Sequence, residues 1–226
     1  MDDIPGLNDG EQLNLDFTKL VEPYMHWPNQ DEYPLNIPML DRSVENVLKN
    51  DLYRAKNFLI LTGYTSLSYL IDTFGNDEKI TAKSVRIVLG FDPNFRGRKR
   101  YHEKPLDKEI KEYWLKKGLS ILQGGSVIKL IAKIENGEVR FKFFQKLHAK
   151  VYVSHNMTMI GSSNFSNNGL KDQTEANYRI LQAENEKAYN NIKLIAENYF
   201  KKGDDYKSIV SLLKNLIKEN SFLCSY

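Results

Sequence analysis

Short hydrophobic runs alternate along this chain with longer segments whose apolar residues recur every three or four positions. The short runs favour β-strands, and the longer periodic segments favour α-helices. The predicted strands are Phe58–Gly63, Val85–Gly90, Val139–Phe143, Met157–Gly161 and Ala176–Leu181. The predicted helices are Val44–Ala55, Ser66–Phe74, Leu106–Lys117, Glu184–Phe200 and Tyr206–Lys218, while Leu119–Ala132 fits either a strand or a helix. Strands that alternate with helices predict an α/β domain with a mostly parallel or mixed sheet.

The first 38 residues differ from the rest of the chain. They contain five prolines and little periodicity, so residues 1–38 are expected to form an irregular arm. Residues 1–33 hold eight acidic side chains and a single base, Lys19, which makes the arm acidic. Residues 39–226 are enough for one domain with a hydrophobic core of ordinary size.

The segment from Lys146 to Glu175 carries the most informative polar residues. Residues 148–153 read HAKVYV, an alternation that predicts a strand with His148, Lys150 and Tyr152 on one face. An imidazole can attack phosphorus, and a neighbouring ammonium can neutralise the phosphoryl oxygens. Alone, however, a His-x-Lys pair is more often the solvated face of a half-buried strand.

The residues that follow supply the other groups that phosphate chemistry needs. A polar turn at residues 154–156 predicts a hairpin, which would carry Ser162 and Asn164 of the Gly-Ser-Ser-Asn run back toward the first strand. By itself that run fits a plain turn as well as a phosphate site. Glu175 could accept the N–H of an imidazole and fix its tautomer, or it could be an exposed carboxylate at a strand end.

Jointly, these side chains resemble the HKD motif of the phospholipase D superfamily, which reads His-x-Lys, then Gly-Ser-x-Asn and a downstream Glu. The matching residues are His148, Lys150, Ser162, Asn164 and Glu175. The resemblance implies a mixed β-sheet flanked by helices on both faces, and phosphodiester cleavage through a phosphohistidine without metal or cofactor. His148 is then the nucleophile, Glu175 orients it, and the other three residues hold the phosphate. The family's Asp, seven residues after the His, is replaced by His155, which argues against a standard lipid-hydrolysing member.

The motif occurs once in the chain. Family chemistry pairs two motifs, one histidine attacking and the other donating a proton. Two-fold pairing is the common way for one chain to present the same residue twice. We therefore expect a homodimer with a composite active site.

Two upstream segments, FLILTGYTS at residues 58–66 and VRIVLGFDP at residues 85–93, resemble the nuclease domains of phospholipase D-like bacterial restriction endonucleases. This resemblance covers residues 40–180 and implies cleavage of DNA in a restriction or phage-defence system. Those enzymes commonly carry a sequence-reading domain after the nuclease, and the residues after Glu175 are expected to be helices of the same domain. A separate sequence-recognition or NTPase subunit is therefore a possible partner.

The charge distribution also favours a polyanionic partner. The net charge is +3, but the residues after the acidic arm carry +10. The basic stretch over residues 105–118 fits a solvated helix face equally well. The residues predicted to bind DNA are Arg96, Arg98, Lys99, Arg100, Lys142 and Lys146.

Several features limit the alternatives. No run of eighteen apolar residues exists, so no membrane span is expected. The single cysteine, Cys224, cannot form an internal disulfide, which is typical of a reduced cytoplasmic setting, and the four histidines lack the spacing of metal ligands. Two other functions remain open: a lipid-directed phospholipase D or phosphatidyltransferase, which predicts apolar membrane-binding loops, and a non-enzymatic nucleic-acid-binding module, which predicts loss of His148 or Lys150.

Overall fold

A computed structural model describes residue 36, residues 43–90 and residues 124–223 of the chain. Its strands are β1 (Asn57–Thr62), β2 (Ser84–Leu89), β3 (Val139–Phe143), β4 (Val151–Val153), β5 (Met157–Gly161), β6 (Asn177–Leu181) and β7 (Asp204–Asp205). Its α-helices are α1 (Val44–Arg54), α2 (Leu67–Ile71), α4 (Gly124–Glu135), α5 (Glu186–Lys202) and α6 (Ile209–Leu223), and two π-helical turns are η3 (Asp72–Asn76) and η5 (Asn168–Asp172).

The strands form one mixed sheet in the order β6-β5-β4-β1-β2-β3-β7. β1 pairs in parallel with β2, and β2 with β3, whereas the remaining neighbours are antiparallel. The registers align Leu61 with Val151, Val151 with Ile160, and Gly161 with Asn177. As a result, one end of the sheet holds the last residues of four strands, β1, β2, β3 and β5. The same end holds the first residues of β4 and β6. We call this the motif end, and the opposite end the far end.

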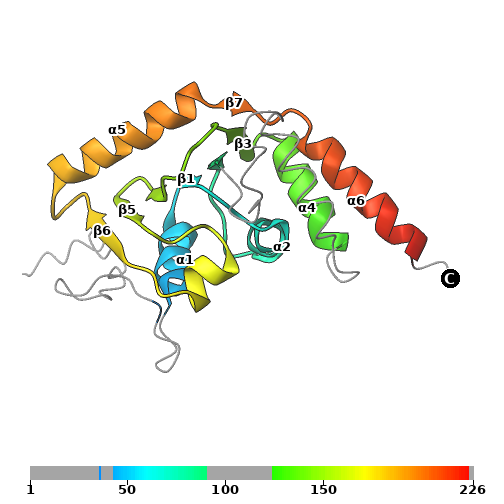
Figure 1. The fold of residues 1–226 in the computed structure, drawn as a ribbon, viewed down its shortest axis with the longest axis horizontal. Coiled ribbons are helices and arrows are strands. Elements are labelled where there is room, and N and C mark those ends of the chain that lie inside the picture. Colours follow the sequence, from blue (N-terminus) through cyan, green and yellow to red (C-terminus); the bar gives the residue numbers. More distant parts are fainter. Residues whose placement is uncertain (1–35, 37–42, 91–123, 224–226) are drawn as a thin grey trace, which may run out of the picture.

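Helices cover both faces of the sheet, as the sequence predicts (Figure 1). Phe58 and Ile60 of β1 pack into a large core with residues of α1, α2, α4 and α6. Leu59 and Leu61 point to the other face, where Ala196 of α5 packs against them. A strand buried on both faces reads as an unbroken apolar run, which is what residues 58–61 show.

Polar side chains begin the helices where the sequence supplies them. Ser43 accepts a hydrogen bond from the backbone N–H of Asn46 at the start of α1, and Asn185 does the same for Ala188 at the start of α5. The ambiguous segment 119–132 is helical in its described part, where Val127, Leu130 and Ile131 lie buried at helical spacing. The helix predicted over residues 106–117 lies outside the described residues.

Two predicted helices differ from the structure in where they begin or in their type of turn. The helix predicted over residues 66–74 ends at Ile71 and continues as the wider turn η3, where Gly75 packs so closely on α4 that an added Cβ would lie 2.2 Å from the Ser126 carbonyl oxygen. The last helix begins at Ile209 rather than Tyr206, because residues 204–205 pair with β3 as the unpredicted strand β7. Tyr206 is buried and contacts Phe143 edge to face.

The strand predicted over residues 148–153 is also shorter than expected, since β4 comprises Val151–Val153. Tyr152 does not share a polar face with His148 and Lys150. It lies in the large core with no exposed surface, and its hydroxyl donates to the carbonyl oxygen of Ser163 at 2.8 Å. Tyr152 is therefore a buried support beneath the loop that follows β5.

No α-helix in the described ranges is long and apolar enough to cross a membrane. Of the predicted N-terminal arm, only Asn36 is described. Its side-chain amide donates to the carbonyl oxygens of Gly169 and Gln173, at 3.3 and 2.6 Å. Asn36 also accepts from the Val44 N–H at 3.0 Å, so it links the start of α1 to the turn η5.

Candidate active site at the motif end of the sheet

His148 and Lys150 lie just before β4, at the motif end of the sheet. The Lys150 ammonium nitrogen is 3.0 Å from Nε2 and 3.1 Å from Nδ1 of His148, and it donates to the His148 carbonyl oxygen at 2.8 Å. The histidine side chain is exposed, whereas Lys150 is only 5% exposed. The pair therefore presents a solvent-accessible imidazole with a cation held directly beside it.

Lys150 lies in an environment that weakens its hold on a proton. Burial lowers the pKa of this lysine, and the nearby Glu175 carboxylate partly offsets that effect. An ammonium with a lowered pKa is a better hydrogen-bond and proton donor than a surface lysine. It is suited to stabilise negative charge that develops on a substrate oxygen.

Asn164 is brought toward His148 by the end of β1. A Cβ added to Gly63 would lie 3.4 Å from the Asn164 side-chain oxygen and 3.5 Å from the His148 Cα, so the Gly63 backbone fits between the two halves of the motif. Thr62 supports the same loop. Its hydroxyl donates to the Tyr64 carbonyl oxygen at 2.6 Å and accepts from the Phe165 N–H at 3.0 Å.

Sequence reasoning missed this role of Thr62. Its hydroxyl lies 3.4 Å from the Asn164 side-chain oxygen, and the side chain is completely buried. The available signal was a threonine that closes an otherwise apolar strand, directly before a glycine. A buried hydroxyl needs hydrogen-bond partners, and here those partners are the backbone on both sides of the candidate site.

Ser162 is tied to the start of β6. Its hydroxyl accepts from the Ala176 N–H at 3.0 Å and donates to the Ala176 carbonyl oxygen at 3.3 Å. In this arrangement the Ser162 hydroxyl holds Glu175, one residue before Ala176, close to the loop after β5. Its predicted contact with a phosphate stays a prediction.

Glu175 lies half-buried just before β6. Its charge raises the pKa of Lys150 and, together with burial, that of Tyr152, so the carboxylate is close to both. Within residues 36, 43–90 and 124–223, Glu175 makes no hydrogen bond to His148 or to any other residue. The carboxylate is thus near the pair, but the predicted bond to the imidazole is not formed in this structure.

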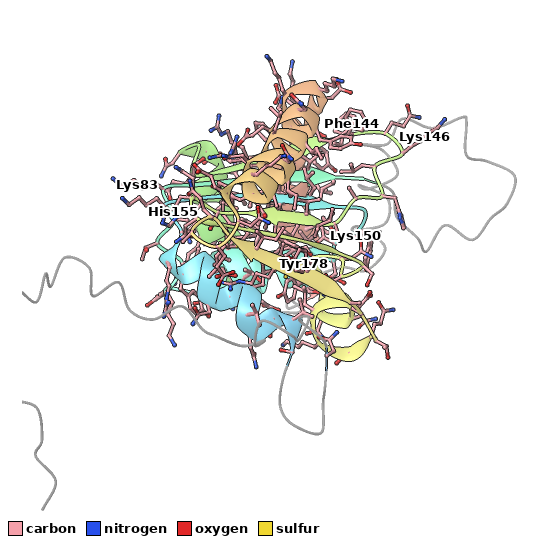
Figure 2. The ribbon with its side chains drawn as sticks, turned by 90° about the vertical axis from the view of Figure 1, so that its left-hand side faces the viewer. Lys83, Phe144, Lys146, Lys150, His155 and Tyr178 are labelled. Atoms are coloured by element: carbon pink, nitrogen blue, oxygen red, sulfur yellow. The ribbon has the colours of Figure 1, made fainter. Side chains whose placement is uncertain are left out.

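The residues predicted to bind DNA fall into three groups. Lys146 lies in the loop beside the site, and its side chain is exposed (Figure 2). Its backbone φ is 64°. Lys142 is held by the protein instead: it donates to the Gly203 carbonyl oxygen at 3.0 Å, pairs with Asp205 at 3.6 Å and lies over the Phe200 ring. Arg96, Arg98, Lys99 and Arg100 lie outside the described residues.

His155, at the position that the HKD pattern assigns to aspartate, is at the far end of the sheet. It occupies the turn between β4 and β5, and its side chain is exposed. Figure 2 shows His155 on the opposite side of the molecule from Lys150. The substitution therefore changes the charge of the far end rather than the candidate site. No group of three or more metal-ligating side chains occurs among the residues that the structure describes.

Comparison with known protein families identifies the family of this chain. The sequence profile of the family described as "Cardiolipin synthase, PLD-like domain" matches residues 53–194. That match spans more than half of the chain, and it contains every residue of the candidate site. The chain therefore belongs to this phospholipase D-like family, whose members act on phosphodiesters. No curated protein matches the chain.

Solved structures resemble the fold more distantly. Nuc, a phospholipase D family member from Salmonella typhimurium, is 14% identical, with a TM-score of 0.47, and the similarity covers 78% of this chain and 99% of Nuc. NucT from Helicobacter pylori is 12% identical over 72% of this chain and 90% of NucT, with a TM-score of 0.44. Phosphatidylserine synthase from Haemophilus influenzae is 10% identical over 85% of this chain and 45% of the synthase, with a TM-score of 0.42.

Proposed function

We propose that this protein is a phosphodiesterase that cleaves DNA without a metal ion, through a phosphohistidine, and that it serves a restriction or phage-defence system. One observation carries the proposal: the Lys150 ammonium lies within 3.1 Å of both ring nitrogens of an exposed histidine. A nucleophile and the cation that neutralises the attacked group are thereby held together. A metal ion commonly supplies the second function in other nucleases.

In the proposed reaction, a neutral ring nitrogen of His148 attacks phosphorus and forms a P–N bond. The P–O bond to the leaving alkoxide breaks, and the alkoxide takes a proton from a general acid. Water then attacks the phosphohistidine and gives a proton to the deprotonated general acid, the P–N bond breaks, and the phosphate product and the free imidazole are released. Lys150 and Asn164 stabilise the charge on the non-bridging oxygens in both steps.

The general acid is supplied by a second His148, from another copy of the chain. One copy of the motif offers a single imidazole, whereas the reaction needs a neutral attacking ring and a protonated donating ring. A two-fold homodimer would place the two rings on either side of one phosphodiester. Mixed dimers of wild type and His148→Ala should then be inactive. Full activity of a monomer in sedimentation-controlled assays would contradict the pairing.

DNA is the proposed substrate because the chain after the acidic arm carries +10 and Lys146 is exposed beside the site. Sequence recognition is assigned to a separate partner subunit. The second candidate is a lipid phosphodiester, which the family's description as cardiolipin synthase favours.

Parallel incubations in EDTA distinguish the two substrates. Plasmid DNA and vesicles containing phosphatidylglycerol are each exposed to wild type and to His148→Ala. We expect nicked or linear plasmid with wild type alone, and intact lipid with both proteins. Cleavage of lipid but not plasmid would select the second candidate, and complete dependence of plasmid cleavage on added Mg²⁺ would contradict both.

A further inference from the structure

The far end of the sheet carries a group of basic side chains that the proposed reaction does not use. Lys56 directly precedes β1, Lys83 directly precedes β2, and His155 lies in the turn after β4. The backbone N–H of Lys83 donates to the Lys56 carbonyl oxygen at 3.0 Å, and Asn57 pairs with Ser84, so the first two are neighbours. Lys193 of α5 completes the set. We call Lys56, Lys83, His155 and Lys193 the far-end cluster.

The cluster is separated from the candidate active site by the length of the sheet. Figure 2 shows Lys83 and His155 together on one side of the molecule, and Lys146 and Lys150 on the other. A six-residue strand such as β1 spans about 20 Å. No side chain of the cluster can therefore contact the phosphate that His148 attacks.

The charges of the cluster are not neutralised within the described part of the chain. None of the four side chains forms an ion pair there. Other surface lysines do, as Lys129 with Glu78 at 3.3 Å and Lys214 with Glu135 at 2.7 Å show. Among the carboxylates near these elements, Glu197 binds Arg86 through two hydrogen bonds, and Glu138 lines a pocket together with Lys83.

Two lysines of the cluster, Lys56 and Lys193, lie close enough to His155 for their charges to act on it. Burial lowers the pKa of His155, and the positive charges of Lys56 and Lys193 lower it further. Like charges at short range oppose folding unless an anion lies between them. A bound polyanion would relieve this repulsion, so the structure is complementary to one.

We propose that the far-end cluster binds the phosphate backbone of a nucleic acid at a second, non-catalytic site. This inference rests on the proposed function, because it takes a nucleic acid as the substrate. Flexible lysines that present point charges suit a repeating phosphate backbone, which they contact without reading bases. Across the sheet, the distance from β4 through β1 to β2 is roughly 10 Å. This distance matches about three successive phosphates on one DNA strand, which are ~3.4 Å apart.

A second contact on the same polymer would raise the effective concentration of DNA at the active site. Long DNA can reach both ends of the sheet. A small diester such as bis(4-nitrophenyl) phosphate needs the motif end alone. The far-end cluster should therefore affect long substrates and leave the small diester unaffected.

The test compares two variants that each remove two positive charges. Lys56→Ala/Lys83→Ala alters the cluster, and Lys129→Ala/Lys214→Ala alters two lysines elsewhere that are already paired. Both are made in the full chain with His148→Ala, and binding of a fluorescent 60-base-pair duplex is measured by anisotropy in EDTA at several salt concentrations. The same pairs in the wild-type background are assayed on bis(4-nitrophenyl) phosphate, and thermal melting confirms folding.

We expect the cluster variant to bind the 60-mer roughly tenfold more weakly at 0.1 M salt, with a salt slope smaller by about 1.8 for two lost contacts. The control variant should keep the wild-type slope, and both should hydrolyse the small diester at the wild-type rate. Two outcomes would contradict the proposed DNA-binding role of the far-end cluster. Equal salt slopes for the two variants, with a wild type that cleaves DNA, would overturn that role and leave the proposed function intact.

Binding of phosphatidylglycerol vesicles in place of DNA, lost on Lys56→Ala/Lys83→Ala, would overturn that role in favour of a lipid surface. A wild-type protein that neither binds nor cleaves DNA would overturn both.

Discussion

The ammonium of Lys150 lies 3.0 Å from Nε2 of His148 and 2.8 Å from the carbonyl oxygen of the same residue. The second contact holds the Lys150 ammonium in place through the backbone of His148, the residue beside which it acts. Because Lys150 is almost fully buried, its charge is not dispersed by solvent. The imidazole therefore meets its substrate beside a cation whose position is already set.

Removal of this cation should reduce turnover with little effect on the fold. Lys150→Met keeps most of the length of the unbranched side chain and removes its charge. We expect kcat on bis(4-nitrophenyl) phosphate to fall by about 10²–10³-fold, the usual cost of losing one preorganised donor. Lys146→Met, which removes an exposed charge beside the site, is the matched control and should retain kcat on this small substrate. A Lys150→Met enzyme as fast as the control would contradict the assignment.

The pH dependence should depend on Glu175. Burial lowers the pKa of Lys150, and the Glu175 carboxylate raises it. Activity that needs the protonated ammonium is present at low pH and is lost as the pH rises through the pKa of Lys150. Glu175→Gln removes the opposing charge, so the alkaline limb of kcat/KM should move to lower pH. An alkaline limb that stays in place, or moves upward, would show that the two groups are not coupled as described.

Thr62 should act as a positioning residue for Asn164. Thr62→Val keeps the shape of the side chain but leaves the Phe165 N–H without its acceptor, which costs about 1–3 kcal/mol of stability. A displaced Asn164 should lower kcat roughly ten- to a hundredfold. Thr62→Ser restores the hydroxyl and should recover most of kcat. A purely structural role predicts equal kcat for folded Thr62→Val and Thr62→Ser.

The buried ion pair between Arg179 of β6 and Asp51 of α1 should be important for stability. The Arg179 Nε donates to one oxygen of Asp51 at 2.7 Å, a terminal nitrogen donates to the other, and Asp51 is 3% exposed. Arg179→Met strands a buried carboxylate and should lower the free energy of unfolding by about 3–5 kcal/mol. Asp51→Leu/Arg179→Met should regain much of that loss in urea denaturation. A double variant less stable than Arg179→Met would show that the pair itself, rather than the stranded charge, is decisive.

The sequence predicts the parts of this molecule that local patterns determine. Apolar runs such as residues 58–61 identify strands because burial on both faces leaves no polar position. The spacing of His148, Lys150 and Asn164 identifies the site because a hairpin at residues 154–156 brings them together. Their convergence on Gly63 needs the pairing of β1 with β4, which lies about 90 residues away in sequence and leaves no local signal.

Some predictions of local structure failed where long-range packing overrides the local pattern. Tyr152 alternates with His148 and Lys150, yet it is buried, because the regular strand begins only at Val151 and both of its faces are covered. Lys142 donates to the carbonyl oxygen of Gly203 and lies over the ring of Phe200, contacts that leave no local signal, and its binding to DNA stays a prediction. The two residues of β7 have no hydrophobic signature and exist because they pair with β3.

The central claim is that His148 becomes covalently bonded to phosphorus without a metal ion. Rapid mixing of the enzyme with bis(4-nitrophenyl) phosphate in EDTA, followed by an alkaline quench and peptide mass spectrometry, tests it directly. We predict a phosphoryl adduct on the peptide that carries His148, assigned by fragmentation to that residue and absent from His148→Ala. Single-turnover hydrolysis that proceeds at full rate with no adduct on His148, or with the adduct on another residue, would contradict the account.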